Sequence, residues 1–402
     1  MIILIFILVV GLVIMFKTRF IMYKDMPNSL GYLKKKEKGI SFLSGLFTSL
    51  AAALGVGNIL GVTQALILGG IGSIFWMWLS SIIGCATKYA EAHLSTLYKE
   101  KKDDEYVSGP MYFIKNGLDN KYMILAYLYA FFGVIASLGI GNMIQANAIN
   151  KALKFNSIIL GVVLVIIVYL TIRYGIKVIS KINNMLVPFI IVLFLSCSIM
   201  ILVKNYKVID DIFILIMKEA CSYKAFLGGN LYVMIKYGIS RGLLSNEAGL
   251  GSSGIIYGCV EEDPHEVGVI AALDPIIDTI ILCSLTFVIV IIDNNYLGMN
   301  INNDYQVVYN AFKNQIGFYG GITVFLSVII LGFLTIISWY YYGLCCYWFL
   351  FKNQKVYLSL YLLFIFLGVL YKSEGIYQFC EIANMLMAIP NLIGILLLIK
   401  KL

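Results

Sequence analysis

Long apolar runs fill most of the chain, and short polar stretches separate them. A helix that spans a membrane needs about 20 mostly apolar residues, and we find eleven runs near this length. The pattern therefore predicts an all-α polytopic membrane protein with about eleven transmembrane helices. The first run has neither a basic leading segment nor a small-residue cleavage site, which favours a retained helix over a signal peptide. The runs lie near residues 1–16, 41–68, 73–98, 121–148, 157–173, 186–203, 230–257, 267–292, 318–348, 355–371 and 376–399.

Two of the runs are interrupted, one by Leu54-Gly55-Val56-Gly57-Asn58 and the other by Ser245-Asn246-Glu247-Ala248-Gly249. Non-helical backbone at membrane depth is tolerated only where it lines a cavity or is buried in protein. Matching breaks in two halves of a chain indicate the substrate and ion sites of a secondary transporter. Tolerated kinks are the alternative, because glycine is common in membrane helices. Asn and Ser near the breaks count against kinks, because they are residue types that start helices.

An internal repeat can be read directly from the sequence. Asn184-Met185-Leu186-Val187-Pro188 in the sixth run resembles Asn384-Met385-Leu386-Met387 with Pro390 in the eleventh. The two breaks are separated by a similar interval, so runs two to six correspond to runs seven to eleven. Because five is odd, the second unit must enter the membrane from the opposite face. We therefore expect a five-plus-five inverted repeat preceded by one extra helix.

The composition supports this class, since 60% of residues are hydrophobic, 13% are charged and the mean hydropathy is +0.89. The segments 17–40, 99–121, 173–181, 352–355 and 400–401 carry 19 of the 30 lysines and arginines, and the opposite loops carry 8. Basic loops stay in the cytoplasm, which predicts an outside N-terminus and a cytoplasmic C-terminus. The acidic stretch 261–266 is the exception among these loops.

Other functional classes have little support in the sequence. No basic soluble domain indicates nucleic-acid binding. The cysteines lack metal or redox spacing, the only histidines are His93 and His265, and no phosphate-binding loop indicates ATP hydrolysis. We therefore expect a protein that is not an enzyme and holds no organic cofactor. Segment 207–226 is either an ordinary connecting loop or a short lid over the outer mouth.

The chain resembles the alanine or glycine:cation symporter family, also called sodium:alanine symporters. The matching blocks span nearly the whole chain, and their order and spacing carry the resemblance. They are Gly55 to Val62, Phe75 to Trp78, Ala86 to Glu91, Gly109 to Tyr112, Gly139 to Asn147, Arg241 to Ser252, Ile277 to Thr279, Trp339 with Tyr341 to Gly343, and Asn384 to Asn391.

The resemblance implies a sodium-coupled importer of small neutral amino acids such as alanine or glycine, in the plasma membrane of a prokaryote. It also implies a LeuT-type fold. We expect an extra helix and basic loop over 1–40, a first repeat over 41–203, an extracellular connector over 204–229 and an inverted repeat over 230–402. A monomer is the simplest expectation for the functional unit. The partners would be the amino acid, sodium and the lipid bilayer.

A transported amino acid brings a carboxylate and an ammonium into a low-dielectric site, where both charges need partners. The amides at a half-helix N-terminus favour the carboxylate, and amide or hydroxyl oxygens favour the ammonium. We expect the substrate to contact Gly55, Val56, Gly57 and Asn58 at the first break, and Ser245 and Asn246 at the second.

Three further residues are candidates for the substrate site. Asn142 and Gln145 lie one turn apart on the fourth helix, where interhelical hydrogen bonding is the alternative role. Trp339 would narrow the pocket for small substrates, although a packing role fits its sequence position equally well.

By the resemblance, sodium would bind backbone oxygens from Leu54 to Gly57 together with Thr335. The chain departs from the family here, because Leu54, Val56 and Leu334 replace residues that usually carry hydroxyls. Ser338, one turn beyond Leu334, is a candidate substitute. Asp274-Pro275 also replaces small or apolar family residues.

Charged residues inside the predicted helices need separate interpretation, because each is costly within the membrane. Lys88 and Glu91 are three residues apart and could form an ion pair, either structural or part of a gate. Arg241 and Glu247 flank the second break and need partners elsewhere. Asp278 is a candidate partner for Arg241.

Two alternatives remain open. A transporter of the same fold could use protons or act without coupling, which the missing hydroxyls favour. A membrane protein could instead bind an amino acid without moving it, although we find no soluble sensory domain. The sequence does not distinguish alanine, glycine and serine, because one methyl group in a pocket is worth only about 1–3 kcal/mol.

Overall fold

The computed structural model describes residues 1–34, 40–102, 105–221, 230–294, 304–371 and 374–402. A helix, or a broken series of helices, occupies each of the eleven predicted ranges, which confirms the all-α prediction. In chain order they are α1 (Ile2–Lys17), α4 (Phe42–Ala53) with η2 (Val56–Asn58) and α5 (Leu60–Gly69), α6 (Ser73–Leu97), α8 (Met123–Leu138) with η4 (Gly139–Met143) and α9 (Ile144–Leu153), α10 (Ser157–Ile172), α11 (Ile176–Lys204), α14 (Asn230–Asn246) with α15 (Ser252–Tyr257), α16 (Pro264–Ala271) with η5 (Ile276–Cys283) and α17 (Ser284–Asp293), α19 (Phe318–Phe351), α20 (Gln354–Leu370) and α21 (Glu374–Leu397).

Shorter elements fill the connections between these helices. They are α2 (Ile21–Asp25), η1 (Met26–Asn28), α3 (Ser29–Tyr32), α7 (Pro110–Gly117), η3 (Asn120–Tyr122), α12 (Tyr206–Ala220), α18 (Asp304–Ile316), η7 (Ile399–Lys401), and an antiparallel pair of strands, β1 (Glu100–Lys102) and β2 (Glu105–Val107). The helix α12 thus covers most of the segment 207–226 that we interpreted as a loop or lid, and residues 222–226 of this segment lie outside the described part. Phe213 of α12 stacks on Trp78 of α6.

Length and apolar composition allow five of the described helical stretches to cross a membrane unaided: 120–153, 176–204, 264–293, 318–351 and 379–397. Two bent pairs raise this number to seven if each pair is one span. One pair is α1 with the stretch Ile21–Tyr32, bent by 66°, and the other is α4 with Val56–Gly69, bent by 60°. The predicted first break is therefore a true change of direction within an apolar helix.

Local sequence accounts for several helix boundaries. The Ser41 hydroxyl accepts a hydrogen bond from the Ser44 amide and caps α4, and the Asp263 carboxylate accepts bonds from the His265 and Glu266 amides and caps α16. Pro110 begins α7 and Pro264 begins α16, at helix positions whose amide would have no intrahelical partner.

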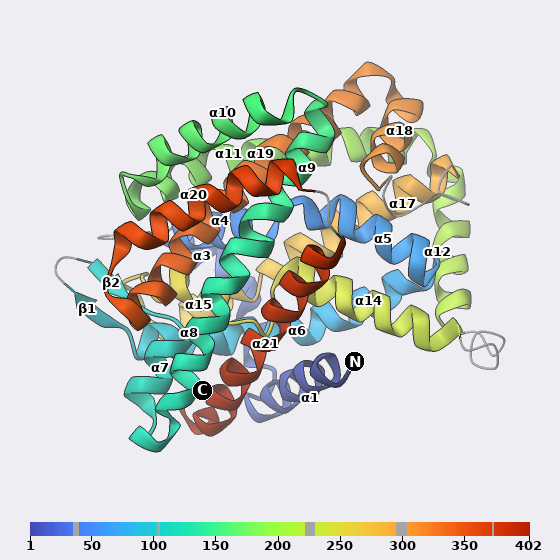
Figure 1. Cartoon of the computed structure of the whole chain (residues 1–402). Coiled ribbons are helices and arrows are strands. Elements are labelled where there is room, and N and C mark those ends of the chain that lie inside the picture. Colours follow the sequence, from blue (N-terminus) through green and yellow to red (C-terminus); the bar gives the residue numbers. More distant parts are fainter. Residues whose placement is uncertain (35–39, 103–104, 222–229, 295–303, 372–373) are drawn as a thin grey trace.

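The helix α6 lies at the centre of one half of the molecule, where it packs against α14, α15, α16 and α1. The long helix α19 is central to the other half, where it packs against α4, α8, α9 and α11. Figure 1 shows α1 at the periphery, beside α6 and α21. The broken helices therefore each pack on one of these two long helices: α14 and α15 pack on α6, and α4 packs on α19.

Candidate functional site

The two helix breaks meet inside the bundle. At the first, the helix stops at Ala53 and resumes in η2. At the second, Glu247, Gly249 and Gly251 have φ angles of 55°, 86° and 75°, so three residues between α14 and α15 are left-handed. A Cβ added to Gly57 would lie 4.0 Å from the Ser245 Cα. The backbones of the two breaks are therefore close neighbours, which both glycine and the left-handed turns allow.

One side-chain hydrogen bond joins the breaks directly. The Ser245 hydroxyl donates to the Asn58 Oδ1 at 3.0 Å, and both side chains are buried. The Asn58 Nδ2 in turn donates to the Asp278 Oδ1 at 2.6 Å and to its carbonyl oxygen at 3.3 Å. Asn58 thus connects the first break, the second break and the helix that carries η5.

Asp278 has a second donor beside Asn58. The Thr279 hydroxyl donates to the Asp278 Oδ2 at 2.7 Å and accepts from the Asn246 Nδ2 at 3.0 Å. The oxygens of Asn58, Ser245, Asp278 and Thr279 therefore form one buried cluster, in which hydroxyl, amide and carboxylate groups converge. Thr279 was not among the predicted site residues, although it directly follows Asp278 in one of the matching blocks.

Neutral groups satisfy the backbone of the first break. The Val56 amide donates to the Gln145 Oε1 at 3.1 Å, and the Thr335 hydroxyl donates to the Ala51 carbonyl at 2.8 Å. A Cβ on Gly55 would lie 2.9 Å from both polar atoms of the Gln145 side chain and from the Thr335 Oγ1. The structure thus brings the predicted Gln145 and Thr335 to the first break, where only glycine leaves room for them.

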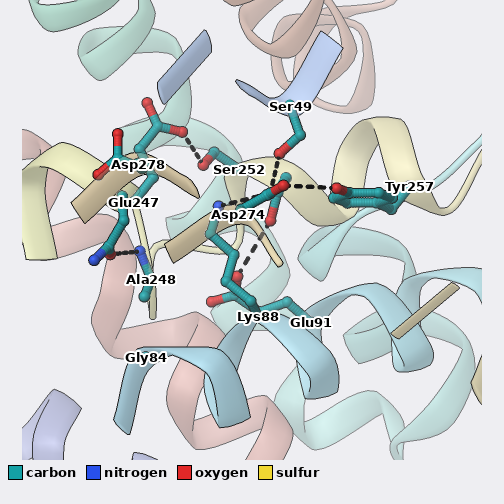
Figure 2. A network of polar contacts seen from close by, with 12 residues as sticks. Ser49, Gly84, Lys88, Glu91, Glu247, Ala248, Ser252, Tyr257, Asp274 and Asp278 are labelled. Atoms are coloured by element: carbon teal, nitrogen blue, oxygen red, sulfur yellow. Dashed lines mark hydrogen bonds and ion pairs between the residues drawn. The ribbon is translucent and has the colours of Figure 1, made fainter. Parts of the chain in front are cut away.

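Charged groups surround the second break. Figure 2 shows Asp274 between Ser49 and Tyr257, with the Lys88 side chain reaching toward it from α6. The Lys88 Nζ lies 3.7 Å from the Asp274 Oδ2. Glu91 accepts bonds from the Gly251 amide at 2.9 Å and from the Asn391 side chain at 2.8 Å. Lys88 and Glu91 come from α6, Asp274 follows α16, and Asn391 belongs to α21.

Glu247 lies inside the second break, and both of its carboxylate oxygens accept hydrogen bonds. The Trp339 Nε1 donates to Oε1 at 3.0 Å, and the Ser252 hydroxyl donates to Oε2 at 2.6 Å. Trp339 also packs tightly on Gly141, where a Cβ would lie 2.3 Å from the tryptophan Cβ. Trp339 therefore bridges the second break and the π-helical turn η4.

Two suggested pairings were wrong. Lys88 pairs with Asp274 and not with Glu91, because Glu91 points to the Gly251 amide and to Asn391. Arg241 pairs with Glu381 of α21 at 2.6 Å and not with Asp278, whose carboxylate is held by Asn58 and Thr279.

Two predicted residues bind neighbouring helices instead of the breaks. The Asn142 Nδ2 donates to the Tyr361 carbonyl of α20 at 2.8 Å, which is the interhelical alternative. The Ser338 hydroxyl accepts from the Asn183 Nδ2 of α11 at 3.0 Å. Neither bond reaches the broken backbone, so both side chains act here as links between helices.

A small cavity of about 20 Å³ adjoins the first break. This volume holds about one water molecule and no amino acid. Its walls are mainly apolar and come from η2, α11, η5, α17 and α19: Leu54, Asn58, Ile59, Ile190, Ile191, Phe194, Leu282, Thr286 and Leu331.

The described residues contain no group of three or more His, Cys, Asp or Glu side chains placed to hold a metal ion. Sodium has different needs, since a hard cation takes hydroxyl, amide, carbonyl and carboxylate oxygens. The oxygen cluster at Asn58 and the carbonyls beside Thr335 offer such ligands.

Comparison with known proteins gives a consistent result. A model of the sodium:alanine symporter family matches residues 1–402. An uncharacterized transporter of Haemophilus influenzae is 36% identical over 404 residues, which cover 96% of this chain and 88% of that protein. The sodium/alanine symporter AgcS of Methanococcus maripaludis is 36% identical over 374 residues, which cover 90% and 82%. The probable sodium/glutamine symporter GlnT of Bacillus subtilis is 30% identical over 406 residues, which cover 97% and 84%.

The fold also matches a solved structure. The crystal structure of MhsT in complex with L-phenylalanine superposes with a TM-score of 0.64 over 90% of each chain, at 15% sequence identity. The chain therefore shares the helical LeuT fold of that protein.

Proposed function

Since the chain belongs to the sodium:alanine symporter family, we propose that it imports a small neutral amino acid together with sodium. Its relatives are transporters and not enzymes, and it is a multi-pass membrane protein. The hydrogen bond between Ser245 and Asn58 carries the proposal, because it makes one site of two helix breaks. Paired discontinuous helices are the places where secondary transporters bind substrate and ions.

We propose eleven spans in which an extra first helix precedes two inverted units of five helices. Each of the eleven apolar ranges is helical in the structure, which supports this count. The distribution of basic residues supports an outside N-terminus and a cytoplasmic C-terminus. In this arrangement α4 and α15 are the cytoplasmic halves of the two broken helices.

The substrate carboxylate would bind the free amides at the start of η2, where Gly55 and Gly57 let it approach the backbone. The Val56 amide is held by Gln145 in the closed structure, so Gln145 would yield this donor to the incoming carboxylate. The dipole at the start of a half-helix favours the negative charge. The breaks supply this donor without any cationic side chain.

The substrate ammonium would lie near the second break, where Ser245 and Asn246 offer oxygen atoms. Asp278, two hydrogen bonds away from Asn246 through Thr279, would contribute its negative charge. Trp339 would form the wall on the side-chain end, because it is anchored to Glu247 and packed on Gly141.

Sodium would bind at one of two oxygen sets in this region. The first is the predicted one, in which Thr335 joins carbonyls from the end of α4; its hydroxyl already contacts the Ala51 carbonyl. The second is the cluster of Asn58, Ser245, Asp278 and Thr279. The second set includes a carboxylate, which would balance the cation charge in a low-dielectric site.

Uptake by purified protein in proteoliposomes tests the proposal. Labelled alanine, glycine and glutamine would be supplied with an inward sodium gradient, with potassium in its place, or with a proton gradient alone. We expect concentrative uptake of alanine or glycine only with sodium. Uptake driven by protons, or exchange indifferent to both cations, would replace sodium coupling by one of the alternatives above. Binding without uptake would contradict transport itself.

A further inference from the structure

One carboxylate, that of Asp274, joins four parts of the molecule just beyond the two breaks. The Ser49 hydroxyl of α4 donates to Oδ2 at 2.5 Å, and the Tyr257 hydroxyl of α15 donates to Oδ1 at 2.8 Å. The Lys88 Nζ of α6 lies 3.7 Å from Oδ2. Asp274 itself follows α16, and all four residues are buried (Figure 2).

The helices α4 and α15 also touch through a glycine. A Cβ added to Gly45 would lie 3.1 Å from the Val260 Cγ2 and 3.2 Å from the Tyr257 Cδ1. Gly45 and Ser49 are one turn apart and share a face of α4. This face therefore closes on α15 by direct packing at Gly45 and by the Asp274 carboxylate at Ser49.

We propose that Asp274 is a positioning residue that holds α4 against α15 and α6 and so closes the pathway from the breaks to the cytoplasm. Release of the hydrogen bond from Ser49 to Asp274 frees α4 to swing about the break at Leu54 and Gly55. The inference rests on the proposed function for the side of the membrane to which the pathway leads, because the proposed orientation makes α4 and α15 the cytoplasmic halves of the broken helices.

The other polar contacts of Asp274 allow the hydrogen bond from Ser49 to break without leaving the carboxylate unpaired. When α4 leaves, Asp274 keeps the hydrogen bond from Tyr257 and the nearby ammonium of Lys88, so no bare charge is created. The charge balance of Lys88 with its other carboxylate neighbours, Glu91 and Glu247, also stays unchanged. At the Asp274 contact the Ser49 hydroxyl loses its partner, and water can replace it in the opened pathway. The swing also breaks the bonds of Thr48 to Ser180 and of Thr335 to the Ala51 carbonyl, which join neutral groups.

Two neighbouring groups favour the opened state. Both the Lys88 Nζ and the Tyr342 hydroxyl are buried, and neither has a hydrogen-bond partner among the residues that the structure describes. Buried polar groups without partners are costly, and water entering between α4 and α15 would satisfy them. The closed state is therefore held chiefly by the Asp274 contacts and by packing, against the hydration that opening restores.

Thiol labelling from the cytoplasmic face tests the inference. The reporter is Ala52→Cys, which lies three residues beyond Ser49 on the same helix and is buried. It would be placed in a Cys221→Ser background, because Cys221 is exposed and the other cysteines are buried. A membrane-impermeant maleimide would be applied to inside-out vesicles, with the background protein lacking the reporter as the baseline.

We expect Ser49→Ala and Asp274→Asn each to speed labelling about 10-fold or more, the factor that a hydrogen bond to a charged group implies. Ser49→Thr, which restores the hydroxyl, should label slowly like the wild type. The matched control is Thr48→Val, because Thr48 donates to the neutral Ser180 of α11 at 3.3 Å. Gly45→Ala should speed labelling by steric means, without touching the carboxylate.

The inference is overturned if Ser49→Ala and Asp274→Asn label at the wild-type rate, including the case in which Gly45→Ala alone labels fast. It is also overturned if Thr48→Val accelerates labelling as much, because any lost bond on α4 would then suffice. Labelling needs no substrate. The two proposals can therefore fail separately. If the variants label as expected but the protein takes up no amino acid, the proposed function is contradicted and the role of Asp274 in holding α4 is still supported.

Discussion

The two helix breaks touch each other, yet neutral side chains hold the backbone of the first break and charged side chains hold the backbone of the second. At the first break, the neutral Gln145 and Thr335 side chains hold backbone groups, and the Asp278 carboxylate accepts its bond from the Asn58 side chain. At the second, Glu247 sits within the turn, and Glu91 accepts a bond from its Gly251 amide. The breaks therefore have different kinds of support although they look alike in the sequence.

This difference indicates that the two breaks have different roles in transport. A neutral hydrogen bond contributes about 0.5–1.5 kcal/mol net, so an incoming ligand can replace Gln145 or Thr335 at little cost. A buried charge left without its partner is far more costly. We infer that the first break rearranges for substrate and sodium while the second stays in place.

The largest expected effect comes from removing the one ammonium beside the second break. Lys88→Met leaves Asp274 without its counter-charge, and breaking a buried pair in this way costs about 3–5 kcal/mol. Thermal unfolding in detergent should show a large drop in Tm, which Asp274→Asn in the same chain should partly restore. Lys115→Met is the control, since its pair with Glu100 is more than a third exposed on the lysine side, and it should leave Tm nearly unchanged. A small drop in Tm for Lys88→Met would contradict the view that charged groups hold the second break more firmly than neutral groups hold the first.

Filling the first break should have the next largest effect. Gly55→Ala puts a methyl group 2.9 Å from Gln145 and Thr335, and such overpacking costs about 1–3 kcal/mol. We expect sodium-driven uptake to fall and Tm to drop less than in Lys88→Met, because the neutral side chains can move. Gly61→Ala serves as the control, since nothing lies within 4 Å of its added Cβ. Equal uptake by the two variants would show that the first break does not take part.

A smaller change should follow from Thr335→Val, which keeps the shape of the side chain and removes its hydroxyl. The loss of the bond to the Ala51 carbonyl is worth about 0.5–1.5 kcal/mol. If Thr335 binds sodium, the sodium concentration for half-maximal uptake should rise about 3- to 10-fold, with little change in that for alanine. An unchanged sodium dependence would move the ion to the cluster around Asn58.

The smallest effect is expected at the ion pair of Arg241 and Glu381, which is partly exposed, unlike the buried charges at the second break. Arg241 and Glu381 lie 2.6 Å apart, and their side chains are 19% and 29% exposed. Partly exposed pairs are worth about 0–1 kcal/mol, so Glu381→Gln should shift Tm only slightly and leave uptake intact. Loss of uptake would reveal a role for the pair in gating.

The sequence predicts the helices well because lipid imposes long apolar runs, and it predicts the breaks because Gly55, Gly57 and Asn58 are residues that interrupt or start helices. The amphipathic helices α12 and α18 were not predicted, because they are shorter and less apolar than a membrane span. Gln145, expected at the substrate site, and Thr335, expected at the sodium site, both contact the backbone at the first break.

The sequence alone could not predict which residues pair with the buried charged side chains. Spacing of three or four residues identifies neighbours on one helix, which is why Lys88 was first paired with Glu91. Its true partner, Asp274, is on another helix, and only the packing of α6 against α16 brings them together. The same holds for Arg241 with Glu381 and for Ser338 with Asn183.

Equilibrium binding of alanine in sodium and in choline at equal ionic strength tests the central claim most directly, that the joined breaks form one site for amino acid and cation. When two ligands bind at neighbouring positions and one tightens the binding of the other, the effect is reciprocal. We expect sodium to tighten alanine binding at least about 10-fold in the wild type, and we expect Asn58→Ala to abolish this enhancement. Equal affinity in both salts, or an enhancement that survives in Asn58→Ala, would contradict the account.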